Sequence, residues 1–301
     1  MADTGPRAGD MTMAAHDPRP IFAAMFAAVR AYLLGAGAES SAAARVATNP
    51  KGEATRAFDA MAERIALDVA REGLGGFRAF SEEAGEIAVG RDPRWTLVMD
   101  PCDGSNNFRR GMRAVGFAVA ALPAGAPLDP ALVEYALCGD IFTGTVYAAA
   151  RGQGATVDGR PIAASRTPIL HHAMLGINLG RERAPTGDMA GDTEDAGGDR
   201  PPIELVLGLL QRAATVRRTG ATVLDLCYVA QGTYDAYADL RDRLTPENFL
   251  APALILAEAG ARFTNAHGLP LGPVEFTRPY SVLAASNDAL LRDILHALGV
   301  Q

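Results

Sequence analysis

The chain has 301 residues, enough for one large domain or two modest ones. Its 49% hydrophobic and 21% charged residues are ordinary values for a globular protein with a full hydrophobic core. The net charge of −7 argues against general nucleic-acid binding, which depends on Lys and Arg neutralising phosphates, but leaves open a small phosphorylated ligand held by local cations.

The sequence gives no signal for export or for a membrane partner. Cys102, Cys138 and Cys227 lack metal-type spacing, and their odd number fits a reducing compartment better than a disulfide framework. No apolar run is long enough to span a bilayer, and the polar segment before Ile21 lacks the apolar core of a signal peptide. We therefore expect a cytoplasmic protein in which residues 1–18 form a disordered arm.

Helices followed by strands are expected in the first half of the chain. Apolar residues recur at helical spacing over 21–34 and 56–72, and a shorter helix is expected over 41–47. Short apolar runs separated by turns then predict mostly antiparallel strands, at 77–80, 97–99, 114–122, 131–137 and 143–150. This pattern is typical of an α+β unit, which we assign to residues 19–165.

Strands and helices alternate in the second half. The expected strands are 173–178, 214–218, 233–238 and 261–264. The expected helices are 203–211, 221–230 and 248–259. This alternation predicts an α/β unit over residues 166–301. Residues 180–202 are rich in Gly, Asp and Pro without apolar periodicity, so we expect a surface loop there and favour an insertion without chemistry over a functional lid.

Two aspartates follow one of the most apolar strands of the first half. The run 97–99 leads into Asp100 and Asp103, within the string D-P-C-D-G-S-N-N-F. Ligands usually bind at strand ends in open α/β folds, and two carboxylates in one turn repel each other unless a cation lies between them. Mg²⁺ prefers such oxygen ligands. The alternative is an acidic turn whose side chains cap the backbone, and the string alone does not distinguish the two.

Further acidic motifs surround this string in a consistent order. Asp59 lies within K-G-E-A-T-R-A-F-D, Glu82 lies within F-S-E-E, and an E-A-G segment begins at Glu258. Together these motifs resemble the inositol monophosphatase-like superfamily of Mg²⁺-dependent sugar phosphatases, and they are most similar to its archaeal-type inositol monophosphatase/fructose-1,6-bisphosphatase branch. The resemblance implies a layered α/β/α/β/α sandwich, a homodimer, and hydrolysis of an inositol, sugar or related small phosphate by metal-activated water.

The resemblance also implies a set of metal ligands. Glu82, Asp100 and the backbone carbonyl of Cys102 would hold a first Mg²⁺, and Asp100 and Asp103 would share a second. The second site would be completed by Asn248, where the family usually has Asp. An amide oxygen can ligate a hard cation, but it brings no charge.

Other positions would orient the water and the substrate. The hydroxyl of Ser105, supported by Asp59, would orient the attacking water, and Glu82 would take part in catalysis. The N–H groups of Gly104 and Ser105 would meet the phosphate. Contacts to the sugar hydroxyls are implied for Gly220, Ala221 and Asp239. A basic cluster just beyond the turn would either bind a second phosphate or, as we favour, form a solvated patch; it comprises Arg109, Arg110 and Arg113.

Several positions depart from the family pattern. Asn248 is one, although in a shifted alignment Glu247 would reach the metal instead. Ser105 stands where Thr is usual, and Pro252 replaces a small residue. These departures motivate a second hypothesis: a diverged member with little phosphatase turnover that acts as a binding protein or catalyses different chemistry in the same pocket.

Overall fold

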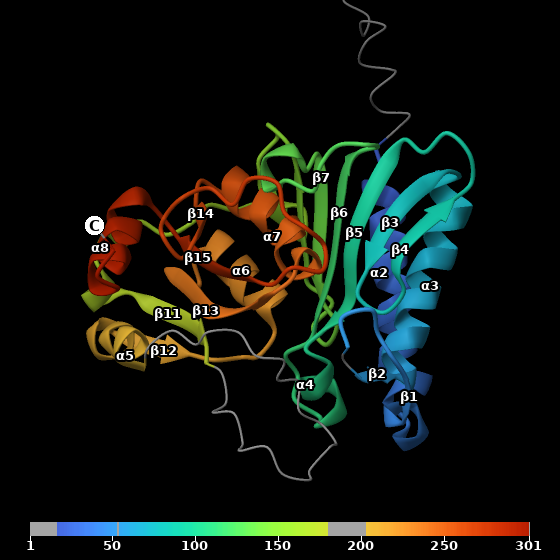
Figure 1. Ribbon diagram of the computed structural model, residues 1–301, viewed down its shortest axis with the longest axis horizontal. Helices are drawn as coiled ribbons and strands as arrows, with labels where there is room; N and C mark the ends of the chain where they lie inside the picture. Colours follow the sequence, from blue (N-terminus) through green and yellow to red (C-terminus); the bar gives the residue numbers. More distant parts are fainter. Residues whose placement is uncertain (1–16, 53, 180–202, 301) are drawn as a thin grey trace, which may run out of the picture.

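The structure is a computed structural model that describes residues 17–52, 54–179 and 203–300 (Figure 1). The predicted arm over 1–18, apart from its last two residues, and the predicted insertion over 180–202 lie outside these described residues. No described helix is long and apolar enough to cross a membrane.

Five layers make up the fold. One face of an eight-stranded sheet is covered by α2 (Arg19–Leu34) and α3 (Ala57–Leu74) (Figure 1). The layer between this sheet and a five-stranded one is formed by α6 (Thr222–Ala230) and α7 (Pro246–Glu258). The outer face of the second sheet is covered by α5 (Ile203–Arg212) and α8 (Asp288–Ala297). One hydrophobic core packs α2 and α3 on the first sheet, a second surrounds the middle helices and reaches both sheets, and a third packs α5 and α8 on the second sheet, so the predicted α/β/α/β/α sandwich is confirmed.

The first sheet contains the predicted meander. Its strand order is β10-β9-β8-β7-β6-β5-β3-β4, and all neighbours are antiparallel except β3 (Phe77–Ser81) and β5 (Trp95–Asp103), which are parallel. The other strands are β4 (Gly85–Val89), β6 (Gly116–Pro123), β7 (Tyr135–Asp140), β8 (Val146–Ala150), β9 (Ala155–Val157) and β10 (Arg160–Pro161). Strand β5 is buried from its second residue to its last, as its apolar run predicts.

The second sheet is mixed. Its order is β12-β11-β13-β15-β14. Strand β11 is parallel to its neighbours β12 and β13, and strand β15 is antiparallel to its neighbours β13 and β14. The strands are β11 (Met174–Asn178), β12 (Thr215–Arg217), β13 (Ala236–Leu244), β14 (Arg262–Asn265) and β15 (Tyr280–Ala285). The chain passes from one sheet to the other between Pro161 and Met174. Neither β15 nor the helix α8 that follows it was expected from the sequence.

The helix expected over 41–47 is wrong. The chain there forms the short 3-10 helices η1 (Ala36–Ala38) and η2 (Ser40–Ala43), and then β1 (Arg45–Thr48), which pairs with β2 (Ala54–Arg56). The β-branched Val46 and Thr48 favour a strand, and the alanine run before them is too short to nucleate a helix alone. The remaining short elements are α4 (Ser105–Arg109), η3 (Pro130–Leu132) and η4 (Leu170–His172).

Candidate active site

The D-P-C-D-G string forms the end of β5 and the start of α4. The register with β6 shifts between Asp100 and Asp103, an irregularity of the kind that re-aims side chains near functional sites. Gly104 then turns the chain with φ of +97°, and a Cβ at this position would lie 3.0 Å from the carbonyl oxygen of Ala114. Only glycine fits there without strain. The strand therefore reaches four residues beyond the predicted 97–99 and carries both aspartates before the chain turns.

Both aspartates are buried and already engaged by the backbone. Asp100 accepts a hydrogen bond from the N–H of Cys102 at 2.9 Å through Oδ1, and one from Nδ2 of Asn248 at 3.1 Å through Oδ2. Asp103 accepts a hydrogen bond of 2.7 Å from the N–H of Val223, in the first turn of α6. The two carboxylates therefore lie where the first sheet meets the middle helical layer.

Glu82 joins these aspartates in a cluster of negative charge. Burial raises the pKa of Glu82 well above its usual range, and Asp100 raises it further. Burial and then the charge of Asp103 do the same to the pKa of Asp100, and burial raises the pKa of Asp103 to about 7. Glu247 adds to all three shifts. The four carboxylates, which we call the acidic cluster, repel one another and favour the arrival of a cation.

Asp59 and Ser105 meet beside this cluster. The Ser105 hydroxyl lies 2.8 Å from Oδ1 of Asp59 and 3.1 Å from the carbonyl oxygen of Cys102. Asp59 is 5% exposed on α3, and burial raises its pKa to about 7. A hydroxyl held between a carboxylate and a carbonyl is well placed to orient a water molecule.

The start of α7 brings Asn248 to the cluster. Thr245 and Asn248 form a capping box, in which Oδ1 of Asn248 accepts the Thr245 N–H at 3.1 Å. Because its oxygen serves this cap, Asn248 turns its amide nitrogen toward Asp100. In this arrangement the amide stabilises the carboxylate directly, and the ligand role expected for its oxygen stays a prediction.

Sequence reasoning missed two buried charged residues. Lys51, in the loop between β1 and β2, forms an ion pair with Glu247 and hydrogen-bonds Oγ1 of Thr245 at 2.8 Å. Asp225 on α6 is fully buried, and burial raises its pKa to about 7. Lys51 is the single lysine, but it lies in a common N-P-K-G loop 196 residues from Glu247, and Asp225 lies in a common L-D-L helix turn, so the local pattern revealed neither environment.

The chemistry of these groups suits a hard divalent cation. Within the described residues no three His, Cys, Asp or Glu side chains form a ready-made metal-binding group, so a cation would take few carboxylates at a time. The other donors are also oxygens, namely the carbonyl of Cys102 and water. Oε2 of Glu247 is buried and has no hydrogen-bond partner within the described part of the chain. Oxygen donors with uncompensated negative charge fit Mg²⁺.

The predicted sugar-contact residues lie just before α6 and on β13. Gly220, with φ of +77°, precedes Ala221, the N-cap residue of α6. Asn107 ties this segment to α4, because its Nδ2 donates to the carbonyl oxygen of Thr219 at 2.9 Å. Asp239 is fully buried and paired with Arg241 at 2.6 Å. The three residues of the predicted basic cluster are exposed: Arg109, Arg110 and Arg113.

Comparisons with known proteins match nearly the whole chain. The model of the inositol monophosphatase family matches residues 17–299. A fructose-1,6-bisphosphatase/inositol-1-monophosphatase of Thermococcus kodakarensis is 29% identical over 254 residues, which cover 84% of this chain and 86% of that protein. The Nus factor SuhB of Pseudomonas aeruginosa is 31% identical over 215 residues, covering 69% and 72%.

Solved structures share the fold. The MJ0109 gene product, an inositol monophosphatase-fructose 1,6 bisphosphatase, aligns with a TM-score of 0.76 at 25% identity over 94% of this chain and 100% of its own. The extragenic suppressor protein SuhB of Bartonella henselae aligns with a TM-score of 0.75 at 20% identity, over 93% and 97%. With the family model spanning almost every described residue, the chain belongs to the inositol monophosphatase family of phosphoric monoester hydrolases.

Proposed function

We propose that the chain is a Mg²⁺-dependent phosphomonoesterase that hydrolyses an inositol, sugar or related small-molecule phosphate by metal-activated water. The observation that carries this proposal is the position of the Asp59–Ser105 pair beside the acidic cluster, with Cys102 touching both. No side-chain nucleophile is needed for such a reaction, because a cation and an oriented water suffice.

The residues of the site would have two separate roles, binding the cation and orienting the water. Glu82, Asp100 and the Cys102 carbonyl would hold the cation, with Asp103 beside them. When bound, the cation would cancel phosphate charge and acidify water. Ser105 orients the water through its hydroxyl, and Asp59 holds that hydroxyl in place at 2.8 Å.

The substrate would approach from the α4 and α6 side of the cluster. The N–H groups of Gly104 and Ser105, at the turn into α4, are our candidates for the phosphate. Gly220 and Ala221 at the start of α6, with Asp239 on β13, are our candidates for the sugar hydroxyls. The chain would work in the cytoplasm as a homodimer, with neither nucleic acid nor membrane as partner.

The alternative of a binding protein without turnover is not favoured. Two relatives that match 84% of this chain are named as phosphatases, the Thermococcus kodakarensis protein and the fructose-1,6-bisphosphatase of Pyrococcus furiosus, which is 25% identical, whereas the Nus factor SuhB of Pseudomonas aeruginosa matches 69%. The departures from the family pattern at Ser105 and Asn248 do not change the proposed oxygen donors for the cation, which are Glu82, Asp100, Asp103 and the Cys102 carbonyl.

The test is release of inorganic phosphate from a panel of esters. Inositol 1-phosphate, fructose 1,6-bisphosphate and several sugar monophosphates would be incubated with the protein while Mg²⁺ is titrated, with a chelator control. We expect Mg²⁺-dependent release from at least one ester. No release from any ester at saturating Mg²⁺, by protein whose folding is verified by calorimetry, would contradict the proposal.

A further inference from the structure

One basic side chain of this protein differs from all the others. The chain has 28 Lys and Arg residues, and Lys51 is its single lysine. Its side chain is 9% exposed, in a loop where its own N–H donates to Oδ1 of Asn49 at 3.0 Å. An ammonium is a compact point charge, unlike the planar guanidinium that the chain uses elsewhere, so Lys51 resembles a small cation more closely than any arginine could.

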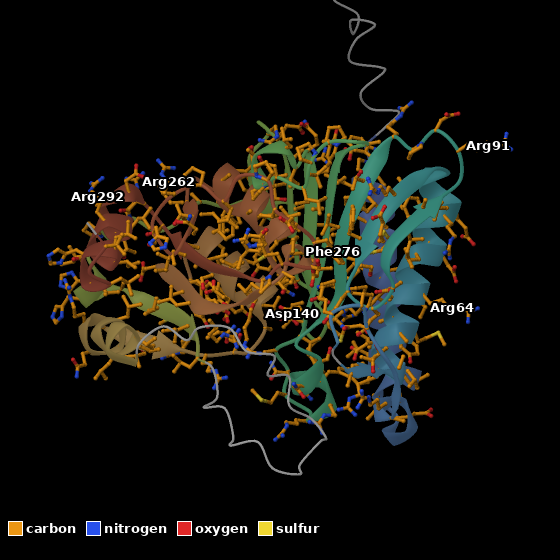
Figure 2. All side chains as sticks on the ribbon, in the orientation of Figure 1. Arg64, Arg91, Asp140, Arg262, Phe276 and Arg292 are labelled. Carbon is orange, nitrogen blue, oxygen red and sulfur yellow. The ribbon has the colours of Figure 1, made fainter. Side chains whose placement is uncertain are left out.

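Three groups from the other half of the chain fix the position of this ammonium. Glu247 pairs with it, Thr245 accepts a hydrogen bond from it at 2.8 Å, and the ring of Phe276 lies 4.6 Å away. Phe276 itself packs on Phe80 of β3, with the ring centroids 5.2 Å apart, and it is labelled near the middle of Figure 2. The ammonium is therefore enclosed between the two halves and does not lie in solvent.

The ammonium faces the acidic cluster. It lowers the pKa of both Glu82 and Asp100, against the larger effect of burial. Its partner Glu247 is a member of the cluster, and the next residue, Asn248, donates to Asp100 at 3.1 Å. A positive ammonium and a neutral amide N–H donor thus lie on the α7 side of the cluster, where the family resemblance expects a second divalent ion.

The net charge of the cluster is the same with Lys51 and one divalent ion as it would be in a site of the family type with two divalent ions. Four carboxylates, one ammonium and one divalent ion leave a single negative charge in the cluster. If position 248 carried a carboxylate and position 51 carried no charge, the five carboxylates and two divalent ions would also have a net charge of one negative unit. The exchange of Asp for Asn at 248 and the presence of Lys51 each make the cluster more positive by one charge, so together they replace the charge of one divalent ion.

We propose that Lys51 is a built-in cation that takes the place of the second divalent ion, so that the free protein binds one divalent ion at the acidic cluster. The proposal rests on the proposed function, which supplies the first ion. Lys51 is a positioning residue, since it acts through Glu247 and the cluster.

The first test counts bound ions without substrate. Calorimetric titration of the metal-free protein with Mn²⁺ should give a molar ratio of about one. The variant Lys51→Met should bind a second ion and approach a ratio of about two, because Glu247 is then unpaired. The double variant Lys51→Met/Glu247→Gln removes both charges of the buried pair together, which such sites tolerate better, and its molar ratio should return to about one.

A ratio of about two in the natural protein, or no change in Lys51→Met, would overturn the proposal. If Lys51→Met does not fold, the natural protein and the double variant still decide it.

The second test follows the ammonium itself. Protein grown with ¹⁵N-labelled lysine carries a label at one side chain only, so its Nζ signal reports Lys51 alone. We expect the signal to remain protected from solvent exchange at saturating Mg²⁺. Loss of protection on adding Mg²⁺ would mean that a second ion displaces the ammonium, and would overturn the proposal. Both readouts need no substrate: ester hydrolysis with two bound ions would refute this inference alone, and one bound ion without hydrolysis of any ester would refute only the proposed function.

Discussion

Replacing Asn248 with Asp tests the electrostatics of the cluster most sharply. The new carboxylate can still accept the Thr245 N–H of the capping box, but it loses the 3.1 Å hydrogen bond to Asp100 and places a like charge beside it. A hydrogen bond to a charged group contributes about 1.5–3 kcal/mol, and two full charges about 4 Å apart repel by about 4 kcal/mol at an effective dielectric constant of about 20, a cost that the two carboxyl groups reduce by sharing a proton. We therefore expect the metal-free variant to lose about 3–5 kcal/mol of stability, a fall in Tm of about 6–15 °C.

Divalent ions should reverse this loss. A carboxylate at 248 supplies the charged ligand that Asn248 lacks, so the rise in Tm on adding Mg²⁺ should be larger in Asn248→Asp than in the natural protein. An ion at a hundred times its Kd stabilises by about 2.7 kcal/mol per site. The measurement is differential scanning calorimetry at pH 8, with and without Mg²⁺.

Asn265→Asp serves as the matched control. Its oxygen accepts the N–H groups of His267 at 2.9 Å and Leu269 at 3.0 Å, and aspartate can accept both, in a turn outside the acidic cluster. This control should show neither the metal-free loss nor the enlarged Mg²⁺ effect. If Asn248→Asp is as stable as the natural protein without metal, the hydrogen bond to Asp100 is not part of the cluster's energetics and the reasoning fails.

Two further predictions concern polar side chains around the cluster. The carboxyl of Asp225 has a pKa of about 7, raised by burial above its unfolded value, so the folded state holds its proton more tightly and stability is lost as pH rises from about 4 to about 7. Asp225→Asn should therefore gain stability relative to the natural protein between pH 5 and pH 8 in urea unfolding, and a pH-independent difference would refute this. Ser105→Ala should lower kcat by about 10²-fold or more while the calorimetric Kd for Mn²⁺ changes little, because the hydroxyl orients water and is not a proposed ligand; a loss of ion affinity equal to the loss of rate would contradict that role.

Local patterns were sufficient to predict most of the helices and strands, whereas their arrangement in five layers was expected only through the family resemblance. The apolar faces of α2 and α3 and the continuous apolar run of β5 follow from periodicity, which depends on burial alone. The D-P-C-D-G string also predicts the turn that follows it, since Gly104 adopts a positive φ that other residues avoid. Over 41–47 the β-branched residues give only a weak local signal for a strand, and the pairing of the exposed β1 with β2, which is not visible in the local pattern, accompanies the observed structure.

The site was predictable only in part, for a related reason. Asp59 and Ser105 are 46 residues apart, and their meeting was expected only through the family resemblance. The orientation of the Asn248 amide depends on its cap at Thr245 and on Asp100, 148 residues away. The role of Lys51 depends on Glu247, 196 residues away. Contacts of such long range leave no periodic trace in the sequence, so the residues that tune the charge of the cluster emerged only from the structure.

The most direct test of a metal-dependent phosphatase centred on the acidic cluster compares Asp100→Asn with Asp68→Asn. Asp68 is an exposed carboxylate on α3, where it pairs with Arg71 at 2.6 Å, so its substitution removes the same charge without touching the site. Phosphate release at saturating Mg²⁺ should persist in Asp68→Asn and be abolished in Asp100→Asn, while Asp100→Asn remains folded because a buried repulsion has been removed. Full activity of a folded Asp100→Asn would contradict the account.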